Sequence, residues 1–440
     1  MSQTKSLHRD ERVKAGNFGK KMMTAGFALA LLFGLASVFF GMGVKDYLGH
    51  YADGGDHWRR FMHAYVTAWS FVTSISVGAL FFVIIHFLVR ARWSTVVRRL
   101  AEGMANAMPV LAIAGLVFII PLVAGYKDLY YWAHGDAHNH ELNHHLAGKL
   151  GWLDPAFFAV RYGIYMIGFS ALAAYFGKKS RQQDESGDPK ITETLRIAAG
   201  PGVIIYALVT IFFSFDILMS LAPKWYSTIY PVNYFGGAMV ATFSVLILLS
   251  LIVQRSGRLT NSITVEHYHD LGKWLFAWTF FWAYTAFSQF MLIWYANIPE
   301  ETIFYKYRFF TDWQPVSIVL AICHFALPFV LLMTRWTKRI LPILAFLAAW
   351  QLVFHWLDLY WNVMPNYNWT YFFTESGAKF FEGPLAGNLG AHPVGFSPVD
   401  ITTMLAMFGV FLIGVGKALH GNLIPVKDPT LKHSLAFENF

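Results

Sequence analysis

The sequence has little charge and almost no cysteine. Charged residues make up 14% of the 440 residues, against about a quarter in a typical soluble domain. The single cysteine, Cys323, excludes an internal disulfide and covalent haem attachment, and an iron–sulfur cluster normally needs about four cysteine ligands. We therefore predict that this chain binds no redox cofactor of its own and that Cys323 is a small buried apolar residue.

Regular metal and phosphate motifs are also missing. The histidine-rich segment HGDAHNHELNHH, residues 134–145, lacks a zinc spacing such as H-E-x-x-H, and no G-x-x-x-x-G-K-[ST] phosphate loop occurs. We predict no metal site, and we interpret these histidines as facing solvent or a partner protein.

Long apolar runs are what the sequence does have. Hydrophobic residues form 56% of it and aromatic residues 18%, and a run of about 20 apolar residues is long enough to cross a lipid bilayer as a helix. We predict an all-α, polytopic membrane protein with about ten transmembrane helices. The predicted spans are 22–44, 64–89, 104–124, 156–176, 197–220, 233–254, 271–296, 315–334, 340–363 and 399–419.

The basic residues predict the orientation. The formal net charge is +8, and Lys and Arg concentrate in the N-terminal tail, in the even-numbered loops and at the C-terminal end. This is the positive-inside pattern, so both termini are expected to be cytoplasmic. Because these residues lie in short loops between apolar runs, we predict no nucleic-acid partner.

The spans divide the chain into six predicted segments. We expect two four-helix bundles, spans 2–5 and 6–9, with flanking helices, and we expect the bundles to be inverted relative to each other because span six would enter from the inside. Inverted repeats are common around substrate and proton pathways. The segments are 1–21 (cytoplasmic basic tail), 22–63 (first span and outer loop), 64–220 (first bundle), 221–363 (second bundle), 364–398 (long outer loop) and 399–440 (last span and cytoplasmic tail).

Three ionisable residues inside predicted spans are the main site candidates, because such residues are costly in hydrocarbon. His324 and His355 lie at matched depth in spans eight and nine, roughly 12–14 Å below the outer surface. Asp358 follows His355 by three positions and shares its helix face. We predict that the three converge in the outer half of the second bundle, to relay protons or to bind beside a quinone. A structural network and bis-His haem ligation are the alternatives.

Arg161 and Asp216 form a second predicted group. They lie at similar depth near the outer ends of spans four and five, so we expect an ion pair. The pair is either structural or lines the outer half of a proton path.

A third group lies along span seven. The first set lies at the cytoplasmic end of the span, where it either anchors the helix at the membrane interface or collects protons. The second set follows on one broad face of the helix and would line a proton path toward the outer side. The first set is His267, His269, Asp270 and Lys273, and the second is Tyr284, Ser288 and Gln289.

Two stretches resemble a known family. They are FDILMSLAPKWYSTIYPVNYFGG at 215–237 and EHYHDLGKWLFAWTFFWAYTAFSQFMLIWYANIPEET at 266–302. Both are similar to the NrfD-like membrane subunits of alternative complex III, a quinol:cytochrome c oxidoreductase. The resemblance is greater to the second such subunit, often called ActF, and the ten-span layout extends it over nearly the whole chain.

The resemblance implies a place in a respiratory complex of the bacterial inner membrane. The implied partners are a second NrfD-like subunit, an outer-face multihaem cytochrome and an iron–sulfur subunit, with haem and iron–sulfur clusters held by those partners. Menaquinol or ubiquinol is the implied reductant. This chain would be a subunit without a cofactor and without catalytic residues of its own, lining a quinone site or proton half-channels. A secondary transporter with a midplane solute site and a purely structural membrane anchor are the alternatives.

Overall fold

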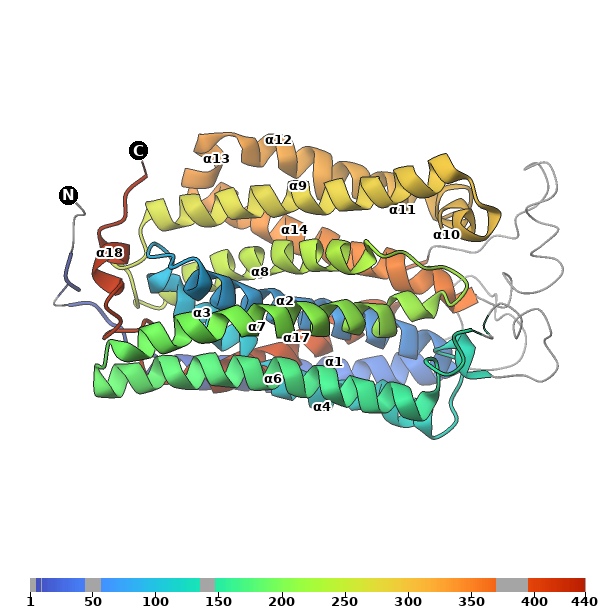
Figure 1. Cartoon of the computed structure of the whole chain (residues 1–440), viewed down its shortest axis with the longest axis horizontal. Coiled ribbons are helices and arrows are strands. Elements are labelled where there is room, and N and C mark those ends of the chain that lie inside the picture. Colours follow the sequence, from blue (N-terminus) through green and yellow to red (C-terminus); the bar gives the residue numbers. More distant parts are fainter. Residues whose placement is uncertain are drawn as a thin grey trace.

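The computed structural model shows an elongated bundle of helices that lie along one common axis (Figure 1). It describes residues 5–8, 10–43, 57–134, 146, 148–368 and 395–439. Both termini lie at the same end, here called the terminal end; the opposite end, where residues 124–134 and 218–229 lie, is the loop end. The all-α prediction is confirmed for the described residues, which form no β-strand.

The α-helices are α1 (Phe18–Gly43), α2 (His57–Leu88), α3 (Thr95–Ala105), α4 (Met108–Val123), α6 (Pro155–Ser186), α7 (Lys190–Ile217), α8 (Tyr230–Arg255), α9 (Val265–Ala296), α10 (Pro299–Phe309), α11 (Gln314–Val319), α12 (Leu327–Met333), α13 (Arg335–Arg339), α14 (Leu341–Val363), α17 (Pro398–Ala418) and α18 (Leu431–Leu435). Short 3-10 turns are η1 (Tyr131–His134), η2 (Met219–Leu221) and η4 (Met364–Asn368). A π-helical stretch, η3 (Leu320–Ala326), joins α11 to α12.

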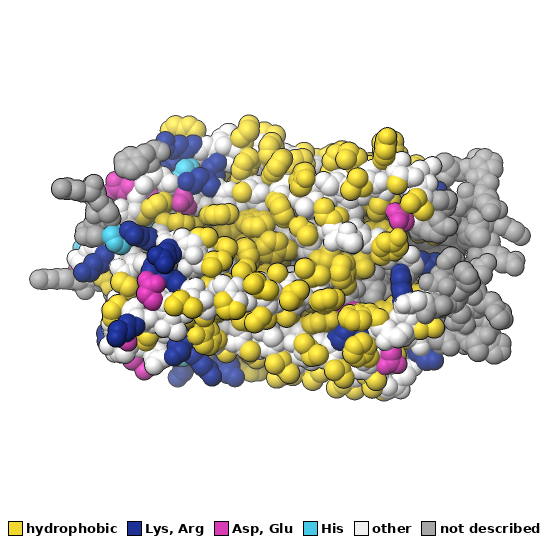
Figure 2. All heavy atoms as spheres, viewed as in Figure 1, with side chains coloured by type: hydrophobic (Ala, Val, Ile, Leu, Met, Phe, Trp, Pro, Cys, Tyr) yellow, Lys and Arg dark blue, Asp and Glu magenta, His cyan; other side chains and the backbone are white. Residues whose placement is uncertain are grey.

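The described residues include nine helices that are long and apolar enough to cross a membrane. Apolar side chains cover the middle of the molecule, and Lys and Arg side chains gather toward the terminal end (Figure 2). A multi-pass membrane protein is therefore confirmed. The nine are Phe18–Gly41, Trp58–Leu88, Thr95–Val123, Pro155–Ser186, Lys190–Leu221, Tyr230–Arg255, Gln314–Met333, Leu341–Tyr367 and Pro398–Ala418.

The remaining predicted span, 271–296, lies in α9, which is too polar by mean hydropathy to be among the nine. Its low hydropathy arises partly from Trp274, Trp278, Trp282 and Trp294, because a hydropathy index scores the amphipathic indole ring as polar. α9 is nevertheless 32 residues long, about 48 Å at 1.5 Å per residue, and it extends along the same axis as its neighbours (Figure 1).

The premise of the predicted inversion of the two four-helix bundles, that span six enters from the inside, is wrong, and the inversion itself is not confirmed. The residues that follow α2 and α8 meet at the terminal end, where Ser434 Oγ donates to the Trp93 carbonyl and the Ser434 carbonyl lies 3.0 Å from His267 Nε2. Helices α2 and α8, the first helices of the two bundles, therefore run in the same direction. The physical reason is simple: four crossings return the chain to the side from which it started.

The core lies where α2 packs against α8. In each of these helices 83% of the most apolar window is buried, whereas the value for α1 is 11%. Close approach depends on Gly78, where an added Cβ would lie 2.3 Å from Thr242 Oγ1 and 2.6 Å from the Ala238 carbonyl. Apolar surface that faces neither neighbour faces the bilayer, as in other membrane bundles.

The first and last long helices, α1 and α17, pack closely side by side. Gly26 and Gly409 face each other so tightly that a Cβ on Gly409 would lie 2.6 Å from the Ala30 nitrogen. Small residues at a helix crossing allow this contact in the absence of a hydrophobic driving force between helices. The predicted flanking helices thus form one pair.

Candidate functional site

The three main candidates meet between η3 and α14. Ligand atoms of His324, His355 and Asp358 all lie within 4.8 Å of one another. All three side chains are buried, with exposed fractions of 1%, 1% and 6%. The two histidines are on different helices, so their convergence depends on the packing of η3 against α14. We call these residues the His–His–Asp cluster.

His355 links α14 to the core helices. Its Nε2 lies 2.9 Å from Ser74 Oγ of α2. Its ring packs onto the backbone of α8, because an added Cβ at Gly237 would lie 2.7 Å from His355 Cε1. Its Nδ1 is buried and has no hydrogen-bond partner among the described residues. One ring nitrogen therefore remains available to a proton or a ligand.

His324 lies in the π-helical stretch η3. Wider turns of this kind occur frequently at functional sites, because they disturb the regular hydrogen bonding of an α-helix. The imidazole meets the Trp282 indole edge to face, with ring centroids 4.2 Å apart. Neither ring nitrogen makes a hydrogen bond of ordinary geometry with a described residue, and the Gln351 side chain is its nearby polar neighbour. A buried polar group without a partner is costly, which makes His324 the least satisfied member of the cluster.

The Asp358 carboxylate accepts only two long hydrogen bonds from the described side chains around it. Trp282 Nε1 donates to Oδ2 at 3.2 Å, and Asn362 Nδ2 donates to Oδ1 at 3.3 Å. Both distances exceed those usual for hydrogen bonds to a carboxylate. The carboxylate therefore retains capacity to accept another donor.

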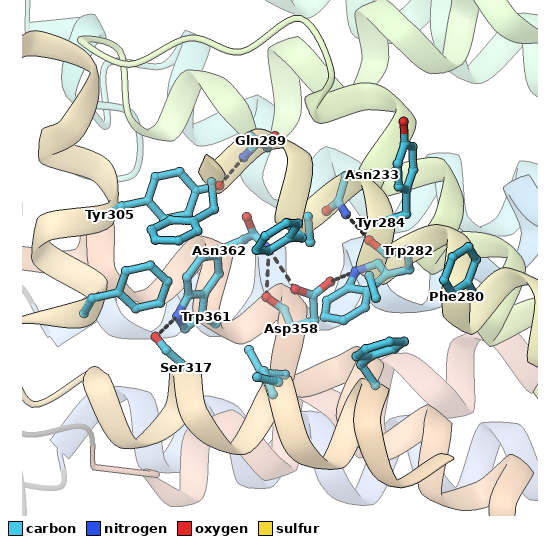
Figure 3. A pocket seen from close by; sticks show the side chains of 18 residues that line it. Asn233, Phe280, Trp282, Tyr284, Gln289, Tyr305, Ser317, Asp358, Trp361 and Asn362 are labelled. Atoms are coloured by element: carbon cyan, nitrogen blue, oxygen red, sulfur yellow. Dashed lines mark hydrogen bonds between the residues drawn. The ribbon is translucent and has the colours of Figure 1, made fainter. Parts of the chain in front are cut away.

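Asp358 also lines a cavity of about 480 Å³ between α9, α10, α11 and α14 (Figure 3). One wall consists of Phe280, Tyr284 and Phe287 of α9, whose exposed fractions are 50%, 58% and 61%. These residues lie on the apolar surface of the molecule, so the cavity is bounded on that side by side chains that face lipid. Polar groups that also line the cavity include Asp358, Asn362 and Ser317.

Several lining residues were not predicted from the sequence. Asn362 follows Asp358 by four positions, so helical spacing could have identified it. Trp282 and Trp361 are aromatic residues in spans rich in aromatics and carry no distinguishing signal. Tyr305 lies on α10, a helix absent from the prediction, and reaches the cavity because its hydroxyl accepts from Gln289 Nε2 at 2.9 Å.

The predicted path along α9 is not a single buried row. Gln289 is buried and Ser288 is half-buried, whereas Tyr284 is 58% exposed. Tyr284 and Gln289 both line the cavity. The three side chains therefore differ in exposure, and a proton path past them stays a prediction.

Arg161 and Asp216 are ion-paired, as the sequence predicts. Arg161 Nε lies 2.6 Å from Asp216 Oδ2, and both side chains are almost fully buried. Asp216 also accepts from Trp152 Nε1 and from the Tyr165 hydroxyl, each at 2.7 Å. Neither member of the pair lines the cavity. The saturated carboxylate indicates a structural role in tying α6 to α7.

The predicted group at the start of α9 is mainly a helix cap. His267 is fully buried, and its Nδ1 accepts from the Thr264 backbone nitrogen at 3.1 Å in a capping box. His269 is buried nearby, and Asp270 forms an ion pair with Lys273. Burial lowers the pKa of His267 to about 4. A neutral, buried imidazole is poorly suited to collecting protons, so that part of the prediction finds no support for His267.

Two predicted features lie outside the described residues. They are residues 135–145 of the histidine-rich segment and residues 369–394 of the long loop.

Two histidines and a carboxylate are also a familiar ligand set for a divalent metal ion. The His–His–Asp cluster could supply one imidazole nitrogen from each histidine and one oxygen from Asp358. The absence of a metal remains a prediction, which metal analysis of the purified protein tests.

Comparison with known proteins gives no further assignment. No protein-family model matches the sequence, and no curated protein matches it.

Proposed function

We propose that this chain is the membrane subunit of a respiratory quinol-oxidising complex and that the cavity beside Asp358 binds the quinol head group. The observation that carries the proposal is the position of Asp358, which belongs both to the cavity wall and to the His–His–Asp cluster. A ligand in the cavity would therefore lie next to three groups that accept protons.

The chemistry of the cavity suits a quinol. A quinol partitions into the bilayer and reaches its site sideways through lipid, and the lipid-facing wall of aromatic residues suits such an approach. Its ring is apolar and its two hydroxyls need acceptors, which Asp358 and the amide oxygen of Asn362 provide. A volume of about 480 Å³ is in the range of small-molecule sites.

Oxidation of one quinol to the quinone releases two electrons and two protons. Asp358 would accept one proton directly, and His324 or His355 would take protons onward through their unpartnered ring nitrogens. The electrons need a redox centre in another subunit, since this chain's cysteine content specifies none. The resemblance to NrfD-like subunits supplies the candidates: an iron–sulfur subunit and a multihaem cytochrome at the loop end, with a second NrfD-like subunit in the membrane.

In this proposal α9 also crosses the membrane, which brings the number of transmembrane helices to ten. Both termini are then cytoplasmic, in a bacterial inner membrane. The residue pattern favours this orientation, because Lys and Arg gather at the terminal end (Figure 2).

The transporter alternative is less well supported. Transporters with a midplane site usually have interrupted helices at corresponding positions of both halves. The helix that contains η3 changes locally to π hydrogen bonding but continues without a break from Gln314 to Met333. Its counterpart in the first bundle, α6, is a continuous α-helix of 32 residues.

Two substitutions test the quinol site. Asp358→Asn keeps the volume and removes the proton acceptor, so we expect quinol turnover of the assembled complex to fall by roughly 100-fold or more. Gly237→Ala would displace the His355 ring by steric contact, and turnover should fall while subunit assembly survives. The controls are Asp312→Asn, at an exposed position, and Gly200→Ala, where an added Cβ meets nothing within 4 Å.

Labelling supplies a readout that does not depend on turnover. A photoreactive quinone should label peptides from α9 or α14 in the wild-type complex, and excess natural quinone should prevent it. Normal turnover in Asp358→Asn together with labelling elsewhere would refute the quinol site. The structural anchor would then be the better interpretation.

A further inference from the structure

A second cavity lies at the terminal end, away from the proposed quinol cavity. Its volume is about 450 Å³, and it is formed by the start of α7, the connection between α2 and α3, and the C-terminal tail. We call it the basic pocket. It is lined by Arg92, Lys190, Arg196, Thr430, His433 and Glu193, among others.

The charge of the basic pocket is unbalanced. Its only carboxylate among these six, Glu193, forms an ion pair with Arg196. Arg92 and Lys190 are exposed and have no ion-pair partner among the described residues. Two cations thus line the cavity without an ion pair to any described residue. The N-terminus of α7 adds a partial positive charge through the helix dipole, although the Lys190 amide already donates to Asp188 Oδ1 at 2.9 Å.

The pocket lies next to an exposed apolar face of α7, which favours a ligand that carries both a phosphate and acyl chains. Ile197, directly after Arg196, is 76% exposed, and Ile204 and Leu208 continue the exposed apolar face of α7 at 62% and 52%. Hydrocarbon therefore begins about one turn beyond the pocket, and the basic residues lie at the level of lipid head groups. A phosphate in the pocket could keep acyl chains attached to it beside Ile197. A freely diffusing phosphate would gain nothing from that apolar face.

We propose that the basic pocket binds the phosphate of an anionic phospholipid whose chains lie along α7. Basic pockets between helices at the cytoplasmic side of membranes commonly hold such head groups. A bound lipid would join α7 to the C-terminal tail through Thr430 and His433, and so would stabilise the packing of the tail against the bundle.

The test measures how lipid changes the unfolding temperature of the full chain, purified in detergent with any accompanying subunits. Phosphatidylglycerol should raise the unfolding temperature of the wild type in a saturable manner, whereas phosphatidylcholine should not. The double variant Arg92→Gln/Lys190→Gln should need roughly 30-fold more phosphatidylglycerol for the same effect, since each cation contributes about 1 kcal/mol near a membrane surface. Arg92→Gln alone should need roughly fivefold more.

The matched control is Lys178→Gln/Lys179→Gln, which removes the same charge from α6 at the same end and outside the pocket. This variant should respond as the wild type does. An equal response of both double variants would overturn the proposal. A rise produced by inorganic phosphate alone, at the same concentration as the lipid, would also overturn it, because the site would then select a free anion.

Discussion

At the residue scale, two buried carboxylates show opposite environments. Asp216 accepts three short hydrogen bonds, from Arg161, Trp152 and Tyr165, at 2.6–2.7 Å. Asp358 has only long side-chain contacts, at 3.2 and 3.3 Å, and faces a cavity. A charge in a fully paired network is held in place, whereas a loosely held one can exchange its proton or its partner. This contrast separates the structural carboxylate from the candidate functional one.

The structural pair can be tested by removing one partner. Arg161→Met should destabilise the protein by about 3–5 kcal/mol, because it leaves the Asp216 carboxylate buried without its counter-charge. The double variant Arg161→Met/Asp216→Leu should recover much of this loss, since no unpaired charge remains. Chemical denaturation in mixed micelles measures both. A single variant as stable as the wild type would contradict a structural role and revive a proton-path role for the pair.

At the element scale, the start of α9 depends on a histidine that is neutral in the folded protein. His267 completes the capping box with Thr264, and its Nε2 contacts the Ser434 carbonyl of the C-terminal tail at 3.0 Å. Because burial lowers its pKa to about 4, the unfolded chain binds a proton at this residue at a higher pH than the folded chain does. Stability from this residue is therefore present above pH 6.5 and is lost as the pH falls toward 4.

His267→Ala should remove this residue's contribution to the pH dependence of stability. We expect the variant to lose about 1–2 kcal/mol at pH 7 through the missing cap, and its stability should fall less steeply than that of the wild type between pH 6.5 and pH 4. Unfolding temperatures measured at several pH values compare the two slopes. Equal slopes would show that His267 does not titrate with unfolding. Quinol turnover at pH 7 should change little, since His267 caps a helix and is remote from the cavity-lining residues.

The π-helical conformation of another element, η3, could not be predicted from the sequence. The spacing of His324 and His355 from the span ends predicted matched depth, and the cluster distances agree with that. The sequence has no signal for the π-helical turns that carry His324. The predicted spans also leave out α10, because its 11 residues include Glu301, Lys306 and Arg308 among aromatics.

At the scale of the whole molecule, α9 decides the topology. Ten crossings place both termini on one side, whereas nine would place them on opposite sides. We expect both termini to be cytoplasmic. In a Cys323→Ala background, a membrane-impermeant maleimide added to intact cells should label Asp312→Cys, at the loop end, and should not label Lys178→Cys, at the terminal end. Tags on the two termini should both be protected.

Labelling of Lys178→Cys in intact cells would reverse the orientation. Protection of one terminal tag and accessibility of the other would show that α9 does not cross. A reversed orientation would place the proposed quinol cavity toward the opposite membrane face. An α9 that does not cross would remove one wall of the cavity.

The sequence by itself determined the membrane class, the approximate spans and the residues worth testing. Apolar runs, and charged residues within them, can be recognised from the local sequence. Hydrocarbon penalises an unpaired charge whatever the fold is. Only the tertiary structure decided which charges meet. It brought the His355 ring next to Ser74 of α2 and against the backbone at Gly237, and it placed Asp358 beside a cavity. These features depend on how helices distant in sequence pack together, and no local pattern records that.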